Sequence, residues 1–143
     1  MKKVVRKNIN NLPYSLHDGV VIGFEVIGDN LIMKFQHGFL RTVEPFEQIN
    51  GSIEIQKIDW DFSFVYLLDY QNVLCGNVGS FTGKKMELTT FINQFKNAEF
   101  NLIDETYGYN TSKFNGYFSE GDIFRECMIE IYHLGDMNYL VEG

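Results

Sequence analysis

Cysteine, proline and long apolar runs are scarce in this chain of 143 residues, which holds only 2 Cys and 2 Pro. Cys75 and Cys127 lie far apart and form no Cys-x-x-Cys pair, so we expect small buried residues rather than a disulfide. No apolar run of about 18 residues occurs, and the first residues lack the apolar stretch of a signal peptide. We therefore expect a soluble, cytoplasmic protein with no membrane partner.

Aromatic residues, by contrast, make up 15% of the chain, as 13 Phe, 8 Tyr and 1 Trp. Each can bury on the order of 150 to 250 Å², and a chain of this length suits one domain. Glycines separate short apolar runs, which is typical of turns between strands. We expect a mainly β domain over residues 1–143, either a β-sandwich or a strongly curled antiparallel sheet. It should contain one short helix and begin with a basic leader segment at residues 1–15.

The clearest element is a β-hairpin between Leu16 and Phe39. Apolar residues alternate along both of its strands, at Val20, Ile22, Phe24 and Val26 and again at Leu31, Met33 and Phe35. The period of two predicts one apolar face directed at the core, with Ile22 opposite Phe35. Gly28-Asp29 suits a two-residue turn, because glycine adopts the positive φ that such turns require. A turn shifted by one residue keeps the same faces together, so the register stays open.

The longest strand signal runs from Gly51 to Tyr70 and follows a second turn dipeptide, Asn50-Gly51, which is typical of hairpins. One face collects Ile58, Trp60, Phe62, Phe64, Tyr66 and Leu68. Val65 and Leu67 fall on the other face, so the strand is either covered on both sides or exposed to a partner on one. We expect cover on both sides.

The second half of the chain predicts the helix and the remaining strands. Glu87 to Asn97 has apolar residues at helical spacing, with Thr89 or Thr90 as the N-terminal cap. Strands are expected at residues 99–109, 113–118 and 125–134. A turn at Gly135-Asp136 should then pair the last of these with residues 137–141 and place Tyr132 opposite Tyr139.

His17-Asp18, just before the first strand, is the most suggestive polar pair. A histidine beside a carboxylate can be oriented as a general base. Neighbours on a strand point to opposite faces, so the two would act together only in a loop, and no motif places a serine or cysteine nucleophile. The alternative is that Asp18 bonds backbone amides at the turn while His17 fills the edge of the sheet. We therefore assign no catalytic residue.

Asp59 and Asp61 are candidates for binding a hard cation. On one strand face their carboxylates would lie roughly 7 Å apart. Calcium, however, needs six or more oxygen ligands and a looped backbone, and an exposed polar face explains the same pattern. The three histidines do not have the spacing of zinc ligands. We expect neither a metal nor another cofactor.

The net charge of −7 falls entirely within residues 97–143, which hold nine acidic and two basic side chains. Asp122, Glu126 and Glu130 lie in its strand-forming part. Such a field repels nucleic acid and attracts a basic protein partner. The alternative is that the charge serves solubility alone.

Two segments of the chain resemble a known group of proteins. LHDGVVIGFEVIGDNLIMKF, from residue 16, and MIEIYHLGDMNYLVE, from residue 128, resemble small bacterial proteins of unassigned function that begin with Leu-His-Asp and a hairpin. Some of these are similar to immunity proteins of polymorphic toxin systems. The resemblance implies a non-enzymatic, β-rich protein whose task is to block a toxin.

These observations lead to one main hypothesis and two alternatives. The main hypothesis is a binding protein of the immunity type that takes a basic toxin on an acidic surface containing Asp122, Glu126 and Glu130. The first alternative is a small-ligand or sugar-binding protein, or a hydrolase, with an aromatic-lined pocket near His17 and Asp18. The second is a homodimer formed through an apolar sheet face.

Overall fold

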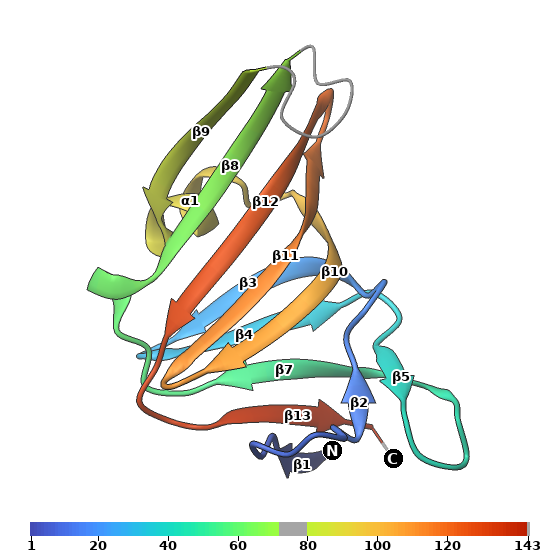
Figure 1. Ribbon diagram of the computed structural model, residues 1–143. Helices are drawn as coiled ribbons and strands as arrows, with labels where there is room; N and C mark the ends of the chain where they lie inside the picture. The colour runs from blue at the N-terminus through green and yellow to red at the C-terminus, as the bar shows by residue number, and fades with distance from the viewer. Residues whose placement is uncertain (72–79, 143) are drawn as a thin grey trace.

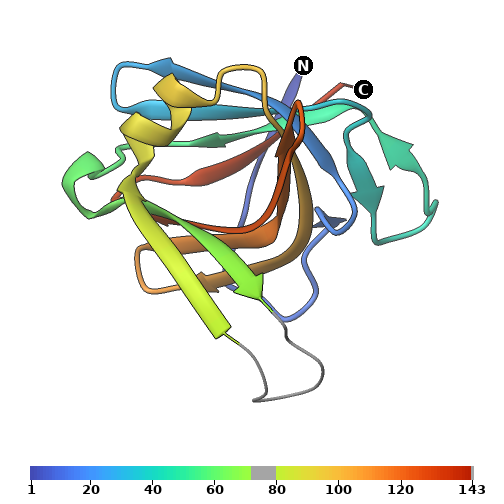
Figure 2. The same ribbon diagram turned by 90° about the horizontal axis from the view of Figure 1, so that it is seen from above.

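The computed structural model describes residues 1–71 and 80–142, which fold into a ten-stranded antiparallel sheet, a three-stranded sheet and a short helix (Figure 1). The large sheet curls strongly around the core without closing into a barrel (Figure 2). The expected mainly β fold with one short helix is confirmed. The curl brings the two halves of the sheet around one core, so every strand of the large sheet can bury one face.

The strands follow an order in space that differs from their order in the chain. From one edge to the other, the large sheet contains β1 (Lys2–Val5), β13 (Met137–Val141), β7 (Gly51–Ile55), β4 (Asn30–Phe35), β3 (Val20–Ile27), β10 (Glu99–Gly108), β11 (Thr111–Glu120), β12 (Ile123–Tyr132), β8 (Phe64–Gln71) and β9 (Ser80–Glu87). The small sheet contains β2 (Tyr14–Ser15), β5 (Phe39–Arg41) and β6 (Gln48–Ile49). The 3₁₀ turn η1 (Trp60–Phe62) precedes β8, and the helix α1 (Leu88–Gln94) follows β9.

The predicted hairpin is present as β3 and β4, and its turn is Gly28-Asp29, with φ of 62° at Gly28. A bulge between Val21 and Gly23 then shifts the pairing, so that Phe35 lies opposite Val21 and not opposite Ile22 as predicted. Val21 is buried in consequence, whereas Ile22 is 45% exposed. Val26, near the turn, is 46% exposed. The predicted buried face is therefore wrong at Ile22 and Val26 of β3, whereas Leu31, Met33 and Phe35 of β4 are buried as predicted.

The long strand predicted between Gly51 and Tyr70 is divided. Its first part ends at Ile55, and Lys57, with φ of 53°, turns the chain before η1. Trp60 and Phe62 lie in η1 rather than on a strand. In β8 Val65 and Leu67 are buried, whereas Phe64, Tyr66 and Leu68 are only half-buried, so the expected cover on both sides is incomplete. Packing against β12, where Val65 lies opposite Ile129, decides between two equally apolar faces.

The helix is shorter than predicted and lies inside the curl of the sheet (Figure 2). No side chain caps it, so the expected threonine cap is wrong; the first amide, that of Leu88, donates to the carbonyl of Ser63 instead. Phe91 anchors α1, because its ring contacts those of Phe24 and Phe118. A helix of two turns needs such tertiary contacts to form. Within the described part of the chain, no helix is long and apolar enough to cross a membrane.

Two predicted turns have other partners. β12 and β13 are not neighbours, and Tyr139 lies opposite Ile53 rather than Tyr132. The expected Gly135-Asp136 hairpin fails because His133 forms a bridge to Ile58, which leads the chain to the other half of the sheet. Asn50-Gly51 likewise links the small sheet to the large one and forms no hairpin.

The N-terminal residues belong to the sheets, so the prediction of a leader at residues 1–15 is wrong. β1 pairs with β13 and forms one edge of the large sheet, and Val4 packs against the core. Lys3 forms an ion pair of 3.1 Å with Glu54 of β7. Residues 14 and 15 pair with β5 in the small sheet.

Cys127 lies in β12 as a free, fully buried thiol, as expected. Burial raises the pKa of this thiol to about 12, so it is unreactive at neutral pH. Cys75, the other cysteine, lies outside the described residues.

Candidate functional site

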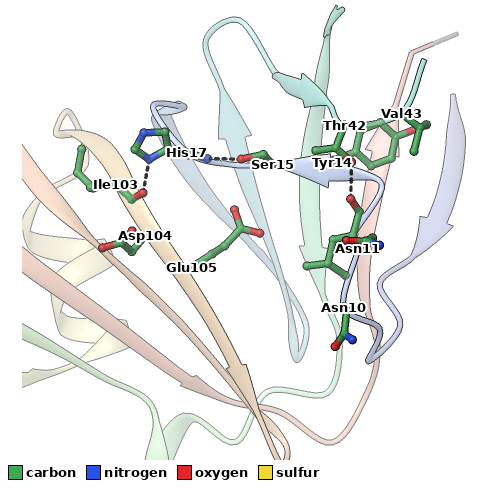
Figure 3. A pocket seen from close by; sticks show the side chains of 11 residues that line it. Asn10, Asn11, Tyr14, Ser15, His17, Thr42, Val43, Ile103, Asp104 and Glu105 are labelled. Carbon is green, nitrogen blue, oxygen red and sulfur yellow. Dashed lines mark hydrogen bonds between the residues drawn. The ribbon is translucent and has the colours of Figure 1, made fainter. Parts of the chain in front are cut away.

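A hollow of about 620 Å³ lies where the segment before β2, the small sheet and β10 meet. We call it the His17 hollow. His17 and Ser15 lie at its rim, and Asn10 and Asn11 line the side formed by the N-terminal segment (Figure 3). The carboxylate of Glu105 points from β10 into the middle of the group (Figure 3). The hollow is open to solvent, and Tyr14 is its one aromatic wall residue.

Two backbone irregularities shape the hollow. Asp18 has φ of 64°, a conformation rare for residues other than glycine, and its amide donates to the carbonyl of Leu102 at 2.8 Å. Opposite it, β10 has a bulge between Leu102 and Asp104. The bulge leaves the carbonyl of Ile103 free to accept from Nδ1 of His17. It also turns Glu105 toward the hollow.

The ring of His17 faces two acceptors. Because the Ile103 carbonyl can only accept, Nδ1 must carry a proton, and Nε2 lies 3.3 Å from Oδ2 of Asp18. The carbonyl first and the Asp18 carboxylate second raise the pKa of His17. The hydroxyl oxygen of Ser15 accepts from the backbone amide of His17 at 3.3 Å.

Glu105 is the functional candidate that the sequence analysis missed. Its Oε2 accepts from the backbone amide of Leu16 at 2.7 Å, and its Oε1 accepts from the hydroxyl of Tyr107 at 3.0 Å. Burial is the largest influence and raises its pKa, against the effect of these hydrogen bonds. Simple alternation from the buried Leu102 would place Glu105 on the outer face. Only the bulge, which has no local signal in the sequence, reverses this.

Asp59 and Asp61 lie elsewhere, in a second hollow of about 420 Å³ beside Trp60 and Leu134. They are not on one strand face, so the geometry predicted for a cation site is wrong. Asp59 instead caps η1, because its carboxylate accepts from the amide of Asp61 at 3.2 Å. Among the described residues, no three His, Cys, Asp or Glu side chains gather as metal ligands.

The acidic candidates gather on the β11–β12 hairpin, at the upper end of both strands in Figure 1. Its turn is Gly121-Asp122, with φ of 60° at Gly121, so it repeats the Gly-Asp turn of β3 and β4. We call this end of the hairpin the acidic tip, which comprises Tyr117, Glu120, Asp122, Ile123, Phe124 and Glu126. Glu130 lies further along β12, where it forms an ion pair of 3.8 Å with Lys113.

Two aromatic rings lie on the acidic tip. The rings of Tyr117 and Phe124 stack with centroids 5.3 Å apart and planes 6° from parallel. Tyr117 is 39% exposed and Phe124 is 65% exposed. The sequence analysis did not identify this pair, because the two residues become neighbours only in the register that places Ser119 opposite Phe124.

Ser112 and His133 form a third polar pair, inside the core. The hydroxyl of Ser112 lies 2.8 Å from Nε2 of His133, and Nδ1 of the ring lies 2.9 Å from the carbonyl of Gly135. Nδ1 therefore carries the proton, and Nε2 accepts from the serine. Ser112 is fully buried and His133 is 4% exposed, so no substrate reaches them. Their role is to satisfy polar groups in the core.

This buried ring should make the protein less stable in mild acid. Burial lowers the pKa of His133, whereas the unfolded chain keeps a value near 6.5. The stability that the neutral ring contributes is complete above the unfolded value and is lost as the pH falls through the folded one. Between about pH 7.5 and about pH 5, the native protein should lose more unfolding free energy than H133Q. Urea denaturation at both pH values measures this, and an equal loss in the two proteins would contradict it.

The candidate residues thus lie in three separate places: the His17 hollow, the hollow at Asp59 and Asp61, and the acidic tip. The two hollows offer carboxylates and an ion pair, and the acidic tip offers carboxylates beside exposed rings. Comparison of the chain with protein-family models, with curated proteins and with solved structures finds no match.

Proposed function

We propose that this chain is a non-enzymatic binding protein that takes a basic protein partner on the acidic tip, as an immunity protein takes its toxin. One observation carries the proposal: the exposed, stacked rings of Tyr117 and Phe124 lie beside the carboxylates of Asp122 and Glu126, which form no ion pair with any described residue. Exposed aromatic residues ringed by polar groups are the usual anchors of protein interfaces.

The rings supply the apolar centre of the interface. Because the two rings stack on each other, both side chains are already held in place. Binding therefore costs little further side-chain entropy. Ile123 is also exposed but lies on the other face of the hairpin, so these two rings alone form the apolar centre. A partner that covers this group removes apolar surface from water at a small cost in conformational entropy.

The carboxylates make the surface specific for a basic partner. Within residues 1–71 and 80–142, no basic side chain lies within 4 Å of Asp122 or Glu126, and Arg125 forms its ion pair with Asp69 at 3.8 Å. Glu130 is balanced by Lys113, so it contributes less than the other two. Unpaired carboxylates around an apolar centre attract lysine and arginine side chains and speed association.

The His17 hollow supports this reading over a hydrolase. A general base needs a nucleophile within hydrogen-bond reach, and the two ring nitrogens of His17 face other groups, the Ile103 carbonyl and the Asp18 carboxylate. The hollow is open, and Tyr14 is the one Phe, Tyr or Trp among the described residues that line it, whereas the expected pocket for a sugar was aromatic-lined.

Charge reversal at the acidic tip tests the proposal. A toxin encoded beside the gene is titrated into the natural protein and into D122K/E126K by calorimetry. We expect the affinity of the variant to fall by at least about tenfold, and that of the natural protein to weaken as salt rises. F124A should lose a similar factor, because it removes the apolar anchor.

The matched control is D29K/E25K, which reverses the same two residue types at the same Gly-Asp turn on the β3–β4 hairpin. Its affinity should stay within about threefold of the natural protein. If the two double variants weaken equally, net charge and not the acidic tip attracts the partner. If D122K/E126K binds as the natural protein does, the proposal is overturned.

A further inference from the structure

We propose that the His17 hollow is a second binding site, which takes a small organic cation with an ammonium or guanidinium group and holds it against Glu105. The site is distinct from the acidic tip and goes beyond the function proposed above. Its geometry is concave, with the carboxylate at the centre and amide and hydroxyl groups around it (Figure 3). Concave sites with a few convergent polar groups are where small ligands bind.

Glu105 has unused capacity for hydrogen bonds. An ionised carboxylate can accept about four, and Glu105 accepts two, from Leu16 and Tyr107. Burial has removed water from this group, which disfavours its charge. A ligand that brings a positive charge and N–H donors restores both the lost solvation and the missing hydrogen bonds.

A second polar group near the hollow also has no partner. The hydroxyl of Tyr139 is fully buried and makes no hydrogen bond with any described residue. The ring of Tyr139 packs against that of Tyr14, which lines the hollow, with centroids 5.0 Å apart. A buried orphan hydroxyl costs about 1–3 kcal/mol in general, so the polar groups behind this wall of the hollow are incompletely satisfied.

The surroundings favour a cation over a sugar or an anion. Asp104 also borders the hollow, and the charge of His17 is balanced by Asp18, so the carboxylates outnumber the cations even when Arg6, which lies over the Tyr107 ring and acts on Glu105, is included. The ring of Tyr14 packs against Phe39 and Tyr139, with centroids 5.3 and 5.0 Å away. It therefore offers little free face on which a sugar could stack. Leu12 and Val43 provide apolar contact for the alkyl part of a ligand.

The test uses butylguanidinium and its uncharged isostere butylurea as probes of the full natural chain. Each is titrated while backbone amide resonances are followed by NMR. Butylguanidinium should give saturable shifts at Leu16, His17 and Ile103, and butylurea should bind at least about tenfold more weakly. Equal binding of the two probes, or no saturable shift with either, would overturn the proposal without any change to the protein.

Variants then assign the binding to Glu105. E105Q should weaken the affinity for butylguanidinium by about tenfold or more. E54Q, which neutralises a half-buried carboxylate bonded to Asn138, should leave that affinity unchanged. An E105Q protein that is folded and binds as the natural one does would refute the assignment. The tip variant D122K/E126K should bind butylguanidinium normally, so failure at the hollow and failure at the acidic tip are distinguishable.

Both a free amine and a lysine or arginine side chain of a bound protein carry the required group. Adding the toxin to the protein saturated with butylguanidinium separates the two sources. Displacement of the probe identifies a side chain of the partner, and simultaneous binding identifies a free cation. Each result presupposes saturable binding at the His17 hollow and supports the site.

Discussion

Truncating Phe91 to alanine should lower the free energy of unfolding by about 3–5 kcal/mol. The ring is 1% exposed and contacts Phe24, Phe95 and Phe118, with centroids 6.0, 5.3 and 5.8 Å away. These contacts hold α1 inside the curl of the sheet, and a helix of seven residues does not form without them. Urea denaturation followed by circular dichroism measures the loss.

Phe124 provides the matched control, because it is the same residue type on the surface. F124A removes the same atoms from a ring that is 65% exposed and stacked only on Tyr117. Its cost should be at most about 1.5 kcal/mol. If both variants lose the same free energy of unfolding, the contacts of Phe91 do not stabilise the fold more than those of a surface ring, and the prediction is wrong. The same denaturation curve also tests that F124A is folded, as its use in the binding experiment requires.

The sequence predicts local pairing well where the signal is short in range. Gly28-Asp29 between two alternating runs predicts the β3–β4 hairpin, and one of the two registers left open places Val26 opposite Leu31, as the structure does. The bulge at Val21 is different in kind. The bulge accompanies the pairing of Val21 with Phe100 of β10, a strand far away in the chain. The alternation of apolar and polar residues in β3 does not show that β10 will be its neighbour.

Faces and turns fail for the same reason. In β8 both faces are apolar, and only the packing of Val65 against neighbouring strands decides which one is buried. The dipeptide Gly-Asp makes hairpin turns at residues 28–29 and 121–122 but not at 135–136. At the third place the bridge between His133 and Ile58 sends the chain across the molecule. Sequence alone cannot rank these long-range pairings against local ones.

The candidate sites also combine features that the sequence can predict with features that it cannot. The distribution of charge alone pointed to Asp122 and Glu126, because the sign of the charge on a surface can be predicted without knowledge of the fold. The stacked rings beside them appear only once the β11–β12 register is known. The state of His17 depends on a carbonyl 86 residues away, at a bulge. The charge of a surface can thus be predicted from the sequence, whereas the contacts that decide what the surface binds require the structure.

Replacing Gly116 with alanine should cost about 3 kcal/mol. Gly116 lies opposite Leu102, at the edge of the β10 bulge, and a Cβ there would lie 1.9 Å from the carbonyl oxygen of Asn101. That contact is with backbone, so β10 itself has to move. G108A is the control, since a Cβ at Gly108 meets nothing within 4 Å. Its stability should stay within about 0.5 kcal/mol of the natural protein.

The same substitution should also change the His17 hollow, some distance from the mutated residue. If β10 moves at Asn101, the Ile103 carbonyl moves with it and loses its alignment with Nδ1 of His17. The pKa of His17, which this carbonyl raises, should then fall back toward its ordinary value in G116A and stay raised in G108A. An NMR titration of the imidazole in both variants measures the shift. A raised pKa in a folded G116A protein would show that the bulge does not depend on the glycine, because the hydrogen bond would have survived the clash.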